Sequence, residues 1–147
     1  MELAEIAHIP DTVAAEWIAC CRRRLPHETC GVLFGRFGGG TVAIDGFAVI
    51  RNAAAEPETS FRFAPDDWVR VWYDSLRQGR EIVGVFHSHP DGSVNPSAVD
   101  LDVMPRWITC WIVGVTAAGT SRIAGYRHDA SAGWRTLHLA GDTPTIA

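Results

Sequence analysis

The sequence predicts an α/β or α+β fold built on a mixed β-sheet, and three observations support this fold class. Short apolar runs bounded by glycine or proline recur along the 147 residues and are typical of buried strands. Amphipathic stretches at helical spacing, over residues 11–25 and 64–79, interrupt the series of strands. The chain length is close to that of one domain, so we expect residues 1–147 to form a single domain.

Composition and charge exclude several classes of protein. Hydrophobic residues make up 47% of the chain and charged residues 20%, which argues against extensive disorder. The net charge of −4 leaves no basic footprint for nucleic acid. No apolar run reaches the roughly 18 residues that a membrane span requires, and residues 1–17 lack the basic region of a secretory signal. We therefore expect a cytoplasmic protein without a membrane or nucleic-acid partner.

The four cysteines form no C-x-x-C pair, so neither a disulfide framework nor a common zinc knuckle is indicated. We expect them to be small buried or half-buried thiols.

The first half of the chain predicts one helix and a hairpin. Apolar residues recur three and four positions apart from Asp11 to Leu25, with Asp11 or Thr12 available as the N-cap, and Pro26 ends the helix. Strands are expected over residues 29–37 and 41–52, joined by a turn of three glycines.

The second half begins with a loop over residues 53–63 that leads into a short strand. Residues 64–79 predict a helix with Pro65 near its start and Gly79 at its end. Its apolar face is expected to comprise Trp68, Val69, Val71, Trp72 and Leu76. Further elements are expected as a strand over 81–89, a short helix over 97–104, and strands over 109–115, 121–128 and 133–140.

Two histidines two positions apart end the strand predicted over residues 81–89. Because side chains alternate along a strand, His87 and His89 share one face, with their Cα atoms about 6.7 Å apart. Ser88 points to the other face, and Pro90 ends the strand. Both imidazoles can therefore bind one metal ion.

A catalytic zinc site needs one more protein ligand and an open position. Asp100 is the candidate, because it follows a turn-rich loop that can fold the chain back toward His89. Ser97 to Asp100 is also an S-x-x-D capping box that opens a helix, and this interpretation stays open beside the first. Asp91 and Asp102 are weaker alternatives for the third ligand. Asp91 lies so close to Pro90 that it would need a tight turn to reach the same ion. Asp102 has no second candidate ligand at a spacing typical of a metal site.

The complete string His87-x-His89-Pro90, six residues, then Ser97-x-x-Asp100 resembles the signature of the JAMM, or MPN-plus, metalloproteases in residue type and in spacing. The segment PHETCGVLFG, residues 26–35, resembles the upstream segment in which that family places a catalytic glutamate. The resemblance extends from the first helix to about residue 125. It implies the MPN fold, a curved mixed β-sheet flanked by helices, similar in arrangement to the cytidine deaminases.

The resemblance also implies a cofactor and a mechanism. One Zn²⁺ per chain would be held by His87, His89 and Asp100. Glu28 would be the general base for a zinc-activated water, and the Ser97 hydroxyl would donate to the oxyanion. The implied reaction is amide hydrolysis without a covalent intermediate.

The chain is close to the minimal domain and is similar to the stand-alone prokaryotic members of the family. Their implied substrates are ubiquitin-like or sulfur-carrier proteins with a Gly-Gly-type tail, cut after the tail. The leaving group is left open between a lysine, a peptide and free cysteine. We expect the extended tail to add to a strand edge beside the metal.

Two alternatives to a metalloprotease are weighed. A non-catalytic MPN scaffold would bind no stoichiometric zinc, whereas every matching position is present here. A zinc deaminase would need H-x-E or C-x-E with P-C-x-x-C, and the sequence has neither. The other four histidines are interpreted as surface or packing residues, namely His8, His27, His128 and His138. An exposed strand edge or the Trp-rich helix over 64–79 could support a homodimer.

Overall fold

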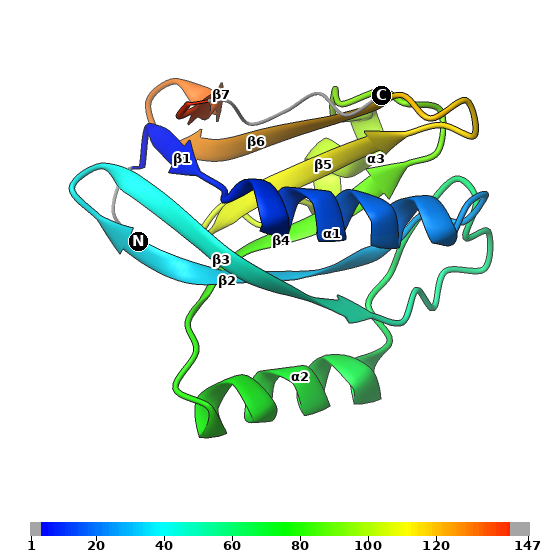
Figure 1. Ribbon diagram of the computed structural model, residues 1–147, viewed down its shortest axis with the longest axis horizontal. Helices are drawn as coiled ribbons and strands as arrows, with labels where there is room; N and C mark the ends of the chain where they lie inside the picture. The colour runs from blue at the N-terminus through cyan, green and yellow to red at the C-terminus, as the bar shows by residue number, and fades with distance from the viewer. Residues whose placement is uncertain (1–3, 142–147) are drawn as a thin grey trace.

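The computed structural model describes residues 4–141, and its strands form one eight-stranded sheet in the order β7-β6-β5-β4-β2-β3-β1-β8 (Figure 1). In chain order the elements are β1 (Ile6–His8), α1 (Asp11–Arg23), β2 (Cys30–Gly38), β3 (Thr41–Ile50), α2 (Pro65–Arg77), β4 (Ile82–His89), α3 (Ala98–Val103), β5 (Thr109–Val115), β6 (Ser121–Asp129), β7 (Gly133–Thr136) and β8 (His138–Leu139). The expected mixed α/β fold is confirmed. The domain predicted over 1–147 includes residues 1–3 and 142–147, which lie outside the described residues.

The sheet curves until it is nearly closed. β7 and β8 are at opposite ends of the strand order, yet a single residue separates them in the chain, so the two edges of the sheet lie close together. β7 pairs with β6, whereas β8 pairs in parallel with β1, with Ile6 opposite His138. Leu137 lies between them: its N–H donates to the Gly125 carbonyl of β6 at 2.8 Å, and the next N–H, of His138, donates to the Glu5 carbonyl at 2.9 Å. The sequence instead predicted a single strand over 133–140, which is wrong.

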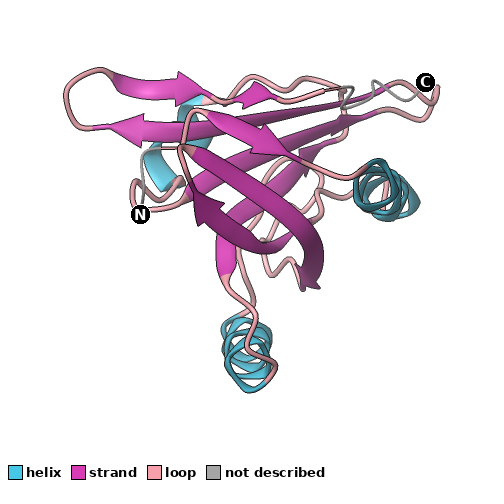
Figure 2. Ribbon diagram, turned by 60° about the vertical axis from the view of Figure 1, so that its left-hand side comes forward, coloured by secondary structure: helices cyan, strands magenta, loops and turns pink. Residues whose placement is uncertain are grey.

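Helices α1 and α2 cover different faces of the curved sheet, and Figure 2 shows both nearly end-on. Trp17 of α1 packs edge-on against Phe86 and Trp111, with ring centroids 5.3 and 6.2 Å apart. On the other face Val71 of α2 packs with Val32 and Ile50. Because β4 alternates its side chains, the two faces receive different residues, and the face away from α1 receives the histidine pair.

The start of α1 differs from the predicted capping. The helix begins at Asp11, but its N-cap is Pro10, which makes no side-chain cap hydrogen bond. The Pro10 carbonyl accepts the first helical bond from Ala14 N–H at 3.0 Å. Proline fixes the backbone before the helix, so neither Asp11 nor Thr12 serves as the cap. The predicted amphipathic pattern is confirmed, because Trp17 and Ile18 are buried.

The apolar face predicted for α2 is only partly buried. Val71 is 5% exposed and Ser75 is 3% exposed, and these residues define the packed side of the helix. Val69, Trp72 and Leu76 were expected to pack, but each is exposed. Figure 1 shows α2 below the sheet, and Val71 is its buried apolar residue in the packed cluster with Val32 and Ile50.

Two other expectations concern the described residues as a whole. Cys21, Cys30 and Cys110 are buried, Cys20 is half-buried, and all four are free thiols, as predicted.

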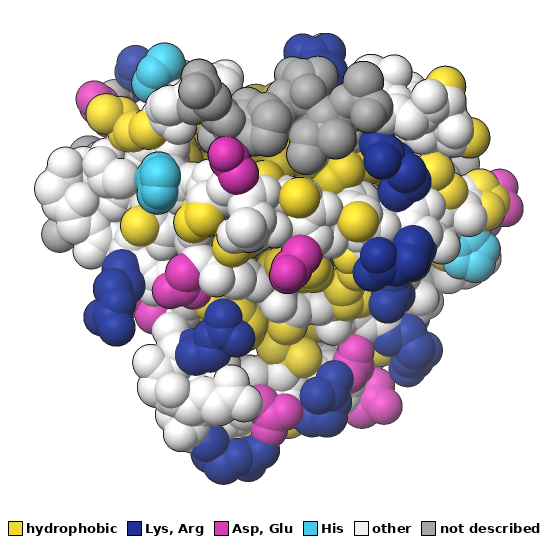
Figure 3. Space-filling view, viewed as in Figure 1, with side chains coloured by type: hydrophobic (Ala, Val, Ile, Leu, Met, Phe, Trp, Pro, Cys, Tyr) yellow, Lys and Arg dark blue, Asp and Glu magenta, His cyan; other side chains and the backbone are white. Residues whose placement is uncertain are grey.

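Within residues 4–141, no helix has both the length and the apolar character needed to cross a bilayer. On the face shown in Figure 3, basic and acidic side chains are interspersed.

Candidate metal centre

The two histidines are placed by β4, which lies inside the sheet between β2 and β5. β4 runs parallel to β5, and the two strands are joined through α3, so the end of β4 opens into the loop that precedes α3. Ligand sites commonly form at this end of a strand in α/β folds. The Nε2 atoms of His87 and His89 lie 3.1 Å apart. β4 pairs with β5 as far as His89 but with β2 only as far as His87. Addition of an extended tail to a strand edge beside the candidate ligands stays a prediction.

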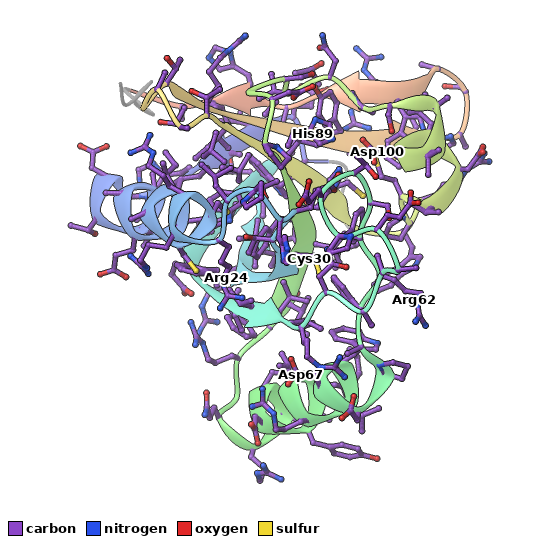
Figure 4. The ribbon with its side chains drawn as sticks, turned by 90° about the vertical axis from the view of Figure 1, so that its right-hand side faces the viewer. Arg24, Cys30, Arg62, Asp67, His89 and Asp100 are labelled. Atoms are coloured by element: carbon purple, nitrogen blue, oxygen red, sulfur yellow. The ribbon has the colours of Figure 1, made fainter. Side chains whose placement is uncertain are left out.

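Asp100 reaches both histidines from the first turn of α3. Its Oδ1 lies 3.1 Å from His87 Nε2, and its Oδ2 lies 3.0 Å from His89 Nε2. The capping box is also present: Ser97 N–H donates to Asp100 Oδ2 at 2.9 Å, and Asp100 N–H donates to Ser97 Oγ at 3.0 Å. Figure 4 shows His89 and Asp100 side by side. The cap therefore fixes the carboxylate that faces the histidines.

The donor set fits a divalent metal such as zinc. Atoms of His87, His89 and Asp100 that can bind a metal all lie within 4.8 Å of one another. Tetrahedral zinc with bonds of about 2.0–2.1 Å places neighbouring ligand atoms about 3.3 Å apart, close to the separations seen here. His89 Nδ1 lies 3.1 Å from the Ser93 carbonyl, which can only accept, so Nδ1 donates to it and Nε2 is the nitrogen that would bind a metal.

The two alternative acids lie elsewhere. Asp91 Oδ1 accepts the Ser93 N–H at 2.9 Å in a local turn, and Asp102 is exposed on α3. Neither belongs to the group of candidate ligands in the described residues. The four remaining histidines are also outside it, and His128 packs against Trp134.

Burial and mutual contacts shift the protonation of all three candidate ligands. Burial lowers the pKa of His87, which favours the neutral imidazole that a metal needs. Burial acts to lower the pKa of His89 as well, but the hydrogen bond and charge of Asp100 raise it overall. For Asp100, burial acts to raise the pKa, yet hydrogen bonds from both histidines hold it well below its usual range. The carboxylate is therefore ionised.

Glu28 reaches the same site from the segment before β2. The antiparallel register pairs Cys30 with His87, and the Ser88 N–H donates to the Thr29 carbonyl at 2.8 Å, so Glu28 comes next to His89. Glu28 is 7% exposed. Burial, offset in part by His89 and reinforced by Asp100 and Asp91, raises the pKa of Glu28 to about 7. A carboxyl group with this pKa can exchange protons near neutrality.

These groups line one open hollow of about 690 Å³, which contains Glu28, His89, Ser97 and Asp100. Ser97 is exposed there, and its Oγ accepts the Asp100 N–H, which leaves the hydroxyl proton free to donate. A separate apolar cavity of about 400 Å³ lies on the other side of His87, between Phe61, Trp68 and Trp107. The polar hollow thus meets the site at His89, and the apolar cavity meets it at His87.

Sequence reasoning missed several residues that support the site. Phe61 stacks on the His87 ring with a centroid distance of 4.4 Å and an interplanar angle of 16°. The Ser88 hydroxyl accepts the Thr29 N–H at 2.7 Å, although the two residues are 59 positions apart. Asn52 was also overlooked; its Oδ1 accepts the N–H of Ala54 two residues later, a local turn that asparagine favours.

Comparisons with known proteins agree with this arrangement. The family described as "Prokaryotic homologs of the JAB domain" matches residues 10–126. The chain is 31% identical to a desampylase of Pyrococcus furiosus over 86 residues, 58% of each chain. It is 36% identical to a desampylase of Haloferax volcanii over 75 residues, 51% of this chain and 52% of the relative.

The chain thus matches just over half the length of these curated relatives. A protein of Desulfitobacterium hafniense whose solution structure is known has a similar fold, with a TM-score of 0.77, 23% identity and 90% of each chain covered. The fold therefore agrees with that of a solved structure over nearly the whole chain. With four-fifths of its length matched by one family, this chain belongs to the prokaryotic JAB-domain family, and the predicted JAMM, or MPN-plus, relationship is confirmed.

Proposed function

We propose that the protein is a zinc-dependent metallopeptidase that hydrolyses the amide bond after the C-terminal tail of a ubiquitin-like or sulfur-carrier protein. One observation carries the proposal: three candidate ligands, His87, His89 and Asp100, lie together, and two of them, His89 and Asp100, line the same hollow as the buried acid Glu28. Membership in the prokaryotic JAB-domain family supports it, as do the two archaeal relatives named desampylases.

His87, His89 and Asp100 would hold one Zn²⁺. When bound, Zn²⁺ acidifies a coordinated water and polarises the substrate carbonyl. Glu28 accepts the proton of the attacking water and delivers it to the departing amine. The Ser97 hydroxyl donates to the oxyanion of the tetrahedral intermediate. Because each of these residues acts by proton transfer or hydrogen bonding, none of them forms a bond to the acyl group.

The hollow favours an extended, small-residue tail over a folded segment. It is bordered by the loop that carries Glu58 and Thr59 and by the loop that carries Asn95. A Gly-Gly tail can lie between two loops without side-chain clashes. We infer that the tail crosses the hollow, because Glu28, His89 and Asp100 all line it.

The test offers the zinc-loaded protein a panel of tail-extended sulfur carriers and ubiquitin fusions and detects cleavage by mass spectrometry. The leaving group varies across the panel between a lysine isopeptide, a peptide and free cysteine. We expect cleavage directly after the tail of at least one carrier. The matched variant Glu28→Gln should bind zinc but lose roughly 10²-fold or more in rate, since general acid–base catalysis typically contributes that much.

Two outcomes would contradict the proposal. If Glu28→Gln cleaves as fast as the unaltered protein, Glu28 is not the base. If the protein binds no stoichiometric zinc and cuts nothing, it is the non-catalytic scaffold instead. A cytoplasmic location and a homodimer stay predictions.

A further inference from the structure

Asn52 follows the end of β3, and its side-chain amide makes four hydrogen bonds. Its Nδ2 donates to the carbonyl oxygens of Glu28 and Ser60, each at 3.0 Å. Its Oδ1 accepts the N–H groups of Ala54 at 3.0 Å and Arg62 at 3.1 Å. Because two carbonyls face one side and two N–H groups the other, only this orientation of the amide satisfies all four partners.

One of these bonds acts on the main chain of Glu28 itself. Glu28 precedes β2, which begins at Cys30. The Glu28 carbonyl accepts the hydrogen bond from Asn52, and the Glu28 N–H donates to the Pro57 carbonyl at 2.7 Å. Both backbone groups of Glu28 therefore depend on Asn52 and on the loop that follows it.

The other three bonds organise that loop. Asn52 contacts the loop near its start, at Ala54, and near its end, at Ser60 and Arg62. The Asn52–Phe63 bridge closes the loop at its base. The same loop brings Phe61 onto the His87 ring and borders the hollow with Glu58 and Thr59.

We propose that Asn52 is a positioning residue: its amide joins the Glu28 backbone and the 53–62 loop into one unit that holds the Glu28 carboxylate at the reaction site. This inference rests on the proposed function. Asn52 acts through Glu28, whereas the metal ligands lie on β4 and α3. A displacement of about 1 Å in a catalytic group can lower a rate by roughly 10²-fold. Loss of the amide should therefore lower kcat far more than it changes KM or zinc affinity.

The test compares Asn52→Asp with the control Ser60→Ala. Asn52→Asp keeps an acceptor for Ala54 and Arg62 but presents oxygen, in place of the N–H donor, to the Glu28 and Ser60 carbonyls. Ser60→Ala removes one local bond of the same loop, from Ser60 Oγ to the Glu56 carbonyl at 3.1 Å, and leaves Glu28 untouched. Asn52→Ala removes the amide, and with it all four hydrogen bonds, without adding charge, so it gives a second comparison if Asn52→Asp does not fold.

We expect Asn52→Asp to lose about 10- to 100-fold in kcat, with KM and zinc affinity within about 3-fold. These rates are measured well below the melting temperature, so reduced stability alone does not lower them. Amide hydrogen exchange should be faster at Glu28 and across 53–62 in the same variant. Ser60→Ala should match the unaltered protein in all of these measurements.

A kcat for Asn52→Asp within about 2-fold of the unaltered protein would overturn the inference, as would an equal loss of kcat in Ser60→Ala. If the unaltered protein cleaves nothing, the proposed function fails, and hydrogen exchange then decides the role of Asn52 by itself. Unchanged exchange at the Glu28 amide in Asn52→Asp would show that Asn52 does not hold the Glu28 backbone.

Discussion

The Asp100 carboxylate takes part in two kinds of contact at once, and the sequence supported each as a separate interpretation. Oδ2 accepts the Ser97 N–H of the capping box and also lies 3.0 Å from His89 Nε2. A carboxylate oxygen has more than one lone pair, so a cap does not exclude a ligand. The local pattern could predict the cap, whereas the contact with the histidines depends on how the loop returns.

Asp100→Asn separates these two contacts. The amide oxygen still accepts the Ser97 N–H, so α3 should keep its cap, but the negative charge that faces the histidines is lost. We expect zinc affinity to fall by roughly 100-fold or more, because changes outside the direct ligands already cost 10–100-fold. Competition with a chelator measures this fall. The control is Asp102→Asn on the same helix, and equal affinities in the two variants would contradict the assignment.

The raised pKa of Glu28 makes the stability of the metal-free protein depend on pH. Burial raises this pKa to about 7 in the folded chain, above its unfolded value, so the folded chain holds a proton that the unfolded chain releases. This contribution is complete below the unfolded pKa and is lost as the pH rises through about 7. Relative to Glu28→Gln, the metal-free protein should lose about 2 kcal/mol in free energy of unfolding between pH 5 and pH 8.

Urea unfolding of both metal-free proteins across this pH range measures the difference. The variant keeps His87, His89 and Asp100, so the difference between the two proteins reports Glu28 and its coupling to His89 and Asp100. A difference that stays constant with pH would show that Glu28 has an ordinary pKa. A bound divalent cation near the carboxylate should lower the pKa of Glu28, so the difference should shrink in the presence of zinc.

At the scale of elements, the strands with a clear alternation were predictable and the shortest ones were not. The period of two along β4 predicted a histidine pair on one face, and the structure shows it. β1 has three residues and β8 has two, which is too short for a periodic pattern. Their pairing depends on distant partners, because β1 lies beside β3 and β8.

The loop between β4 and α3 packs directly on β5, and Gly114 permits this contact. An added Cβ at Gly114 would lie 2.2 Å from the Gly92 carbonyl oxygen, so the loop would have to move. The loop also carries the Ser93 carbonyl that orients His89. We therefore expect Gly114→Ala to lower zinc affinity by about 10-fold although it alters no ligand.

The control for this substitution is Gly38→Ala, because a Cβ there meets no atom within 4 Å. Chelator competition and thermal unfolding of both variants give the comparison. An unchanged zinc affinity in Gly114→Ala would show that the loop can shift without disturbing His89.

At the scale of the whole molecule, the site combines segments that are far apart in sequence. The resemblance to the JAMM signature pointed to all of them, but composition and periodicity alone could not have brought Glu28 to the histidines. The register between β2 and β4 does this, through Cys30 opposite His87. The orientation of α2 could not be predicted either, since its apolar residues extend beyond the side that meets the sheet.

Removal of the metal should destabilise the protein without unfolding it. The three hydrophobic clusters of the described chain contain none of the candidate ligands, so the core should persist in the metal-free protein. A ligand at 1,000 times its dissociation constant adds about 4 kcal/mol to the free energy of unfolding. Thermal unfolding with excess zinc and with a chelator measures the shift, which should disappear in Asp100→Asn. A zinc-independent melting temperature would contradict the site.

The placement of β8 against β1 also has a consequence for synthesis on the ribosome. Every residue of the candidate site, from Glu28 to Asp100, is made before β5 and β6 complete the middle of the sheet. The contact between Ile6 and His138 can form only after residue 138 has left the exit tunnel. Until then the candidate ligands lie on a sheet that is still open between β1 and β8, and among the described strands this seam is the last to be joined.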